Sequence, residues 1–283
     1  MISLFSDTGA RKDIQYNGLS LNVDESDEDQ DYTLTDTVGT RTGLDYVSEM
    51  KPQEDGLEVY APRKAARIIT LKGWVAKPTY AELYDRMEEM AEALDPSNIA
   101  YQNSDPFLPL RFTTVTADTT NHANGVIDCC YFALPLAFPE PVMTDRQGIV
   151  ARWECSFMLK DPRRYAYSAT TQSGAGTITD LGGTRVFPTL TITMAGAGSA
   201  TYAVRNGATV GVTTLTLDLS GLAAADEVVV DMATRTITVN DVTDMSLYVS
   251  GDYFPIEPGS NVITYTNTTN ATSVLTYRTA YSL

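Results

Sequence analysis

The feature that most constrains the fold is a series of short segments, rich in Thr, Val, Ile and Tyr, that fills the chain after residue 180. Turn signals such as Asn206-Gly207 and Pro258-Gly259 lie between these segments. Evenly spaced short strands separated by turns are the sequence signature of a β-sandwich. The predicted strands lie within residues 188–194, 200–206, 213–219, 226–232, 234–240, 245–250, 261–267 and 273–279.

The first half of the chain carries one convincing helix, predicted over residues 78–94. Thr79 and Glu82 match a capping box, and Pro78 stands where the start of a helix tolerates proline. Asp95-Pro96 is expected to end the helix, because the residue before a proline disfavours the helical conformation. One apolar face follows the helical period and indicates packing on a core. It consists of Leu83, Met87, Met90, Ala91 and Leu94.

Strands are predicted around this helix over residues 66–76, 110–115, 125–138 and 149–159. In the last of them the apolar residues alternate with polar ones, so one side is expected to face the core. The predicted core side is Ile149, Ala151, Trp153, Cys155, Phe157 and Leu159. The other side is Val150, Arg152, Glu154 and Ser156. This part is therefore expected to be a β-sandwich or barrel-like sheet covered by one helix, and the whole chain to be mainly β.

The composition changes partway along the chain, which predicts two domains. No lysine follows Lys160, and residues 166–179 contain almost no large apolar side chain. Such a stretch is typical of a linker. We expect an N-terminal β domain over residues 1–165, a linker over 166–180 and a C-terminal β-sandwich over 181–283.

The net charge excludes tight binding of nucleic acid, because phosphate binding needs a basic patch. The formal net charge is −16 and the isoelectric point is near 4.4. The sequence contains no apolar run long enough to span a bilayer, and its first residues lack the apolar core of a secretory signal. We therefore expect synthesis in the cytoplasm, no membrane insertion and no stable binding of nucleic acid.

Motifs for catalysis, cofactors and metals are not found in the sequence. The single histidine, His122, lies in a turn-rich segment, where a solvated loop histidine is the expected role. Cys129 and Cys130 are adjacent in a predicted strand, so they point to opposite faces, which is poor geometry for a shared metal. The acidic run at residues 24–31 lacks the glycine and glutamate of a calcium-binding loop. We expect no enzyme activity, no cofactor and no metal site.

A carbohydrate-binding adhesin or lectin-like module is the alternative interpretation of the C-terminal sandwich. Sugar rings usually stack on aromatic side chains, and Tyr248 and Tyr253 are the candidate platform. The pattern of a glycosylation acceptor occurs at Asn267 and Asn270, where turn geometry is the simpler interpretation.

Stretches in matching order resemble the distal tail protein family of long, non-contractile bacteriophage tails. In the first, residues 66–94, a strand, Gly, Trp and a capped amphipathic helix follow one another. In the second, residues 157–167, a strand ends in Asp-Pro. The third group lies in the C-terminal domain, at residues 187–192, 228–240 and 254–265.

The resemblance implies an N-terminal domain that assembles six copies into a ring, and a galectin-like or carbohydrate-module-like C-terminal β-sandwich. It implies a location in the virion, at the tail tip. The implied partners are the tail tube protein, the C-terminus of the tape-measure protein, and the hub and fibre (receptor-binding) proteins. Genome DNA would pass through the lumen of such a ring, and an acidic lumen would repel it.

Candidate interface residues are taken from the strand, the helix and the acidic loop of the N-terminal domain. The alternative roles of these elements are a core strand, a core-covering helix and a solvated loop. The candidates are Arg67, Ile69, Leu71, Trp74, Tyr80, Tyr84, Asp27 and Asp29.

Overall fold

The structure is a computed structural model that divides into two compact units, residues 1–163 and 164–283. It describes residues 14–21, 33–39, 44–45, 48–50, 57–59, 63–64, 67–115, 119–120, 122, 125–136, 142–143, 149–208 and 211–281.

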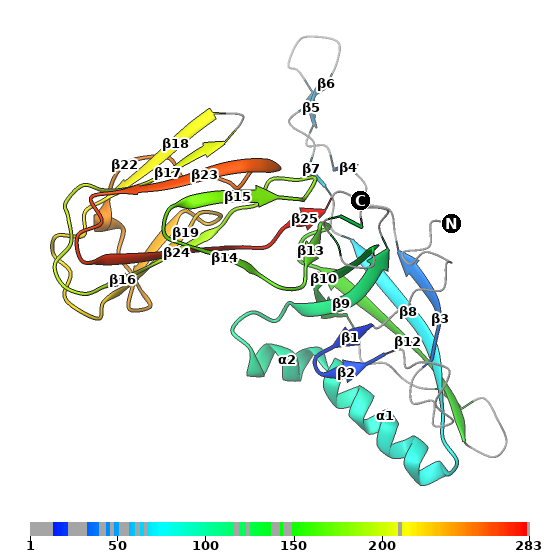
Figure 1. The fold of residues 1–283 in the computed structure, drawn as a ribbon. Coiled ribbons are helices and arrows are strands. Elements are labelled where there is room, and N and C mark those ends of the chain that lie inside the picture. Colours follow the sequence, from blue (N-terminus) through cyan, green and yellow to red (C-terminus); the bar gives the residue numbers. More distant parts are fainter. Residues whose placement is uncertain are drawn as a thin grey trace. The chain divides into compact units, whose positions relative to one another are not determined.

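The first unit is built on an antiparallel sheet with the strand order β2-β1-β9-β10-β12-β8-β3 (Figure 1). Its strands are β1 (Gln15–Tyr16), β2 (Leu19–Ser20), β3 (Thr33–Gly39), β8 (Ile68–Ala76), β9 (Leu108–Val115), β10 (Val126–Pro135) and β12 (Val150–Leu159), and β12 also pairs with β11 (Val142–Met143). Two short hairpins pair β4 (Leu44–Asp45) with β7 (Arg63–Lys64), and β5 (Ser48–Met50) with β6 (Leu57–Val59).

Alternation along β12 sets the core of this unit as the sequence predicts. The side chains of Ala151, Trp153, Cys155, Phe157 and Leu159 are all buried, whereas Arg152 and Glu154 between them are exposed. Phe157 packs edge-to-face on Tyr16, with ring centroids 5.0 Å apart. The Tyr16 hydroxyl donates to the carbonyl oxygen of Ala133 at 3.0 Å, which ties β1 to β10.

The predicted helix is confirmed as α1 (Tyr80–Leu94), with Thr79 as its N-cap. Both halves of the capping box are present. The Glu82 amide donates to Thr79 Oγ1 at 3.3 Å, and the Thr79 amide donates to Glu82 Oε2 at 3.2 Å. The helix buries Leu83, Met90 and Leu94, three positions of the predicted apolar face.

A second helix, α2 (Pro96–Gln102), follows at once, so the expectation of one helix is wrong. Asp95 is extended, as a residue before proline prefers, and ends α1. The same residue then caps α2, because its Oδ1 accepts from the Ser97 amide at 2.9 Å. Pro96 occupies the first turn, where its missing N–H costs nothing. Neither helix is long and apolar enough to cross a bilayer, and the described residues contain no other α-helix.

The second unit is a β-sandwich of two antiparallel sheets (Figure 1). One sheet has the order β14-β24-β16-β19-β20-β21 and the other β15-β23-β17-β18-β22. The strands of the first sheet are β14 (Thr170–Ser173), β16 (Thr189–Met194), β19 (Glu227–Asp231), β20 (Thr236–Val239), β21 (Val242–Thr243) and β24 (Ala271–Tyr277). Those of the second are β15 (Gly176–Asp180), β17 (Tyr202–Ala208), β18 (Gly211–Leu217), β22 (Tyr248–Gly251) and β23 (Gly259–Thr266). A short 3-10 helix, η2 (Met245–Leu247), precedes β22, and β13 (Arg164–Ala166) pairs with β25 (Ala280–Tyr281).

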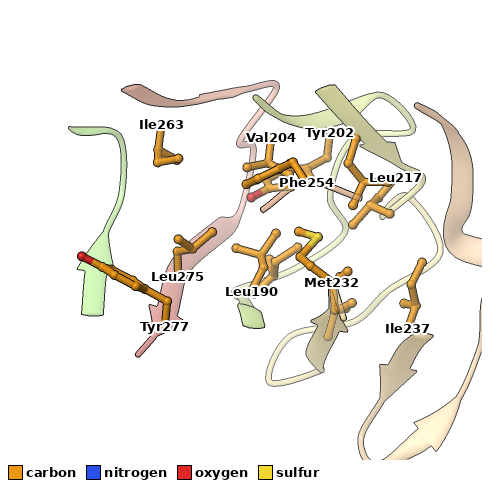
Figure 2. Close-up of a cluster of buried hydrophobic side chains, with 14 of the residues drawn as sticks. Leu190, Tyr202, Val204, Leu217, Met232, Ile237, Phe254, Ile263, Leu275 and Tyr277 are labelled. Atoms are coloured by element: carbon orange, nitrogen blue, oxygen red, sulfur yellow. The ribbon is translucent and has the colours of Figure 1, made fainter. Parts of the chain in front are cut away.

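Side chains from both sheets fill one core between the layers, as Figure 2 shows. Leu190 and Leu275 come from one sheet, and Val204 and Leu217 from the other, and all four are fully buried. The mainly β fold class, with a C-terminal β-sandwich, is therefore confirmed.

The linker predicted over residues 166–180 is wrong, because this stretch forms β14 and β15, the edge strands of the two sheets. An edge strand can expose most of its side chains, so it needs few large apolar residues. Ile178 and Asp180 are the exceptions here, with only 4% and 3% of their surface exposed. The absence of apolar residues therefore marked an edge rather than a linker.

Candidate oligomer and partner surfaces

Two candidate interface residues of β8, Ile69 and Leu71, lie in the core of the first unit. Their exposed fractions are 2% and 0%. A partner cannot reach these side chains while the unit keeps this packing. The structure therefore gives both residues the alternative role, that of a core strand.

Arg67, which directly precedes β8, is also a buried residue. Its Nη1 donates to the Tyr131 hydroxyl at 3.3 Å, and its guanidinium carbon lies 5.5 Å from the centroid of the Tyr131 ring. The Tyr131 ring in turn stacks on Phe112, with centroids 5.1 Å apart. These contacts fix Arg67 within the unit, which favours the alternative role of a core residue over that of an interface residue.

Trp74 is half-buried and lines a groove of about 650 Å³ on the outward face of β8 and β12. In the register of these strands Trp74 lies beside Arg152, and Lys72 lies beside Glu154. Lys72 Nζ and Glu154 Oε2 form an ion pair at 2.8 Å. Val142 of β11 completes the outer side of the groove. Sequence reasoning missed this groove, although the alternation in β12 already placed Arg152 and Glu154 on the outward face.

On α1 the two candidate tyrosines are exposed, as an interface role requires. Tyr80 and Tyr84 have exposed fractions of 56% and 47%, and their ring centroids are 6.4 Å apart. Positions separated by four residues lie on the same side of a helix, which explains the pairing. A hollow of about 360 Å³ lies along the helix and is lined by Lys77, Pro78, Glu82, Asp85, Arg86 and Glu89. The structure thus leaves an aromatic pair and a mostly acidic surface open on α1.

In the second unit the candidate sugar platform is a stacked pair. The rings of Tyr248 and Tyr253 are nearly parallel, at 8°, with centroids 6.1 Å apart. The Tyr248 hydroxyl donates to the Gly251 carbonyl oxygen at 2.8 Å, which fixes the ring. Sugar binding stays a prediction.

The glycosylation-like asparagines adopt turn geometry. Asn267 and Asn270 have φ angles of 55° and 53°, and both side chains donate to backbone carbonyl oxygens of the loop between β16 and β17, those of Thr201 and Ala197. Asparagine tolerates this left-handed conformation better than most residues. Turn formation therefore accounts for both residues.

The remaining candidates lie outside the described residues or at least partly inside the fold. Asp27 and Asp29, with the whole acidic run at residues 24–31, lie outside the described residues. His122 is half-buried. Cys129, Cys130 and Cys155 are buried free thiols, and the described part of the chain holds no cluster of metal-ligating side chains.

A buried carboxyl group in the second unit predicts an unusual pH dependence. Burial raises the pKa of Asp180 above its usual range, and the Thr279 hydroxyl, which donates to Oδ1 at 2.6 Å, offsets this only in part. A pKa raised by folding favours the folded state at low pH, and this contribution is lost as the pH rises through the folded pKa. We expect Asp180→Asn to raise the unfolding temperature of the second unit at pH 7 and to leave it nearly unchanged at pH 3.5.

Calorimetry of the full chain at both pH values measures this effect. Asp252→Asn, at an exposed carboxylate of the same unit, is the control and should change neither value by much. A lower unfolding temperature for Asp180→Asn at pH 7 would contradict the assignment of Asp180 as a destabilised buried charge.

Comparison with known proteins gives the class of the chain. Residues 181–281 match the family model of the siphovirus-type tail component, C-terminal domain. No curated protein matches the sequence. Among solved structures, the Dit protein (gp 19.1) of phage SPP1 matches with a TM-score of 0.60 and 15% identity, over 95% of this chain and 99% of that one. The phage p2 baseplate, in its activated conformation with Sr, matches with a TM-score of 0.46 and 13% identity, over 88% of this chain and 91% of that one.

Residues 181–281 thus match a family of bacteriophage tail components. Nearly the whole chain shares the fold of the SPP1 Dit protein. The resemblance to the distal tail proteins, inferred from the sequence, is confirmed.

Proposed function

We propose that the chain is a non-enzymatic adaptor, which forms a six-membered ring at the distal end of the tail tube. The ring would join the tube and the end of the tape-measure protein to the hub and fibre proteins that meet the host. One observation carries the proposal: a tail-component domain over residues 181–281 occurs in a chain that shares the Dit fold over 95% of its length. The SPP1 protein with this fold is described as a paradigm of the hub adsorption apparatus in phages that infect Gram-positive bacteria.

The surfaces of the first unit suit an assembling subunit. Its outward face holds an amphipathic groove of about 650 Å³ beside Trp74, and α1 exposes Tyr80 and Tyr84. Half-exposed aromatic side chains next to charged groups are typical of protein interfaces. We assign these two surfaces, rather than the buried Arg67, Ile69 and Leu71, to contacts between subunits or with the tail tube.

The proposal predicts the native mass of the purified chain. Light scattering coupled to size exclusion should give about six times the subunit mass of 30.8 kDa, and negative-stain images should show rings. Tyr84→Glu or Trp74→Glu should shift the mass toward that of the monomer, because a charge is then buried in the interface. Thr193→Glu, at an exposed position of the second unit, is the control and should keep the mass of the unmodified chain.

A stable monomer or dimer that forms no ring with purified tail tube protein would overturn the adaptor proposal. Sugar binding measured on a glycan array would then favour the lectin-like alternative.

A further inference from the structure

The second unit carries a strip of exposed apolar side chains at one edge of the sandwich. We call it the apolar edge, and it consists of Val242, Met245, Tyr248 and Val249. Their exposed fractions are 69%, 45%, 39% and 49%. All four lie on the segment that crosses from β21, at the end of one sheet, through η2 to β22, at the end of the other. Single exposed apolar residues need no explanation, but four of them within eight consecutive residues of one anchored segment indicate an interaction site.

The segment that carries the apolar edge is anchored to the sandwich. Leu247, in its middle, is only 8% exposed, and its carbonyl oxygen accepts from the Asp218 amide at 2.8 Å. The Asp244 amide donates to the Ile237 carbonyl oxygen at 2.9 Å. Tyr248 is held by its own hydrogen bond to Gly251 and by the stack on Tyr253. A partner therefore meets side chains that are already ordered, which lowers the entropic cost of binding.

The geometry of β22 favours docking through side chains over the addition of a strand. The register between β18 and β22 shifts where Thr216 and Leu217 face Ser250 and Tyr248, so Val249 is the extra residue of a bulge. A bulge disrupts the ladder and blunts a sheet edge against pairing with another strand. A partner is therefore expected to cover the four apolar side chains rather than extend the sheet.

The charges around the apolar edge indicate the chemistry of the partner. Asp241, Asp244 and Asp252 lie on or directly beside the segment, which has no basic residue. Between residues 218 and 257 the chain has one base, Arg235, which lies near the Tyr253 hydroxyl and is outnumbered by the acids. The acids in that range are Asp218, Asp226, Glu227, Asp231, Asp241, Asp244, Asp252 and Glu257.

Hydrogen bonds keep the acidic rim ionised. The Ser246 hydroxyl and amide both donate to Asp244 Oδ1, at 2.6 and 3.0 Å, and lower the pKa of this carboxyl. Asp218 receives the same pair of bonds from Ser220, and its pKa is lowered too. Two copies that met through this edge would bring these carboxylates together, which disfavours a second copy as the partner.

We propose that the apolar edge docks a different protein of the phage particle, through a patch with an apolar centre and a rim of lysine or arginine side chains. This inference concerns the second unit alone and does not require the ring. The native mass tests the ring, and photocrosslinking at position 249 tests the apolar edge. Either proposal can therefore fail while the other stands.

Site-specific photocrosslinking in assembled tails tests the docking. The full chain carries p-benzoylphenylalanine in place of Val249, or in place of Thr171 on the exposed edge strand β14 as the control. Irradiated tails should contain a crosslink from position 249 to another protein, within an apolar segment flanked by Lys or Arg, and none of comparable yield from position 171. A crosslink to a second copy, a target segment without basic residues, or equal yields at the two positions would overturn the proposal.

A smaller substitution covers the case in which the photoreactive residue prevents incorporation into tails. Val249→Ser should lower the amount of bound partner that survives a high-salt wash by about tenfold, since it removes apolar contact worth about 1–2 kcal/mol. Val262→Ser, at a valine of β23 that is 44% exposed, should leave that amount unchanged. Equal retention of every tail protein in the two variants would also overturn the proposal.

Discussion

Asn261→Ala is expected to destabilise the second unit by about 3 kcal/mol, because it leaves several buried polar groups without partners. The Asn261 side chain is fully buried at 0% exposure. Its Nδ2 donates to the carbonyl oxygens of Glu257 and Gly259 at 2.7 and 3.1 Å. Its Oδ1 accepts from the Glu257 amide at 2.9 Å and from Asn206 Nδ2 at 3.1 Å. One amide thus holds the turn that leads into β23.

Calorimetry of the full chain measures this loss as a lower unfolding temperature for the second unit. Both tryptophans, Trp74 and Trp153, belong to the first unit, so the transition seen by tryptophan fluorescence should not move. Ser260→Ala is the matched control, since Ser260 is the exposed neighbour on the same strand, and it should change the stability by less than about 0.5 kcal/mol. If Asn261→Ala destabilised the second unit no more than Ser260→Ala does, water would replace the lost hydrogen bonds. The turn would then not depend on the Asn261 side chain.

Phe157→Ala is expected to destabilise the first unit by about 3–5 kcal/mol, the usual range for deleting a buried aromatic side chain. Phe157 is 0% exposed and lies at the centre of the sheet, on β12. Its ring meets Tyr16 of β1, so the substitution leaves a cavity and removes an aromatic pair. Burial raises the pKa of the Tyr16 hydroxyl far above its usual value, in keeping with a site closed to water.

Urea unfolding followed by tryptophan fluorescence reports this effect, because Trp153 lies on the same strand as Phe157. Glu154→Ala is the matched control, as it changes an exposed residue of β12. It removes the exposed ion pair with Lys72, which is worth no more than about 1 kcal/mol. If Phe157→Ala lowered the free energy of unfolding no more than Glu154→Ala does, the result would contradict the packing of this core.

Strong local signals made most of the fold predictable from the sequence. Alternation in β12 identified its buried side, and the Thr79–Glu82 pair identified the capping box of α1, which begins two residues after the predicted start at residue 78. The errors arose where the same residues are compatible with two different local structures. Asp95-Pro96 signals the end of a helix, but the same pair also begins α2. Threonine and glycine suggest a linker, but they equally suit the exposed edge strands β14 and β15.

The candidate surfaces were harder to predict, because a sequence pattern does not distinguish exposure to a partner from burial in a core. Ile69 and Leu71 belong to a β-branched strand that is equally consistent with an interface or a core, and the structure shows the core. Tyr80 and Tyr84, the candidates taken from the helix, are exposed in the structure. The apolar edge gave no sequence signal, since Val242 and Val249 are ordinary strand residues whose exposure depends on the ends of two sheets.

The three thiols of the chain are all sequestered in cores, which has a practical consequence for biochemistry. Cys129, Cys130 and Cys155 are buried, and burial raises the pKa of Cys155 to about 12. The reactive thiolate form of Cys155 is therefore scarce at neutral pH. A cysteine introduced at an exposed site such as Thr171 or Val249 would react with a maleimide dye far faster than the native thiols. Fluorescent labelling of single positions, and counting of subunits by photobleaching, therefore requires no cysteine-free background.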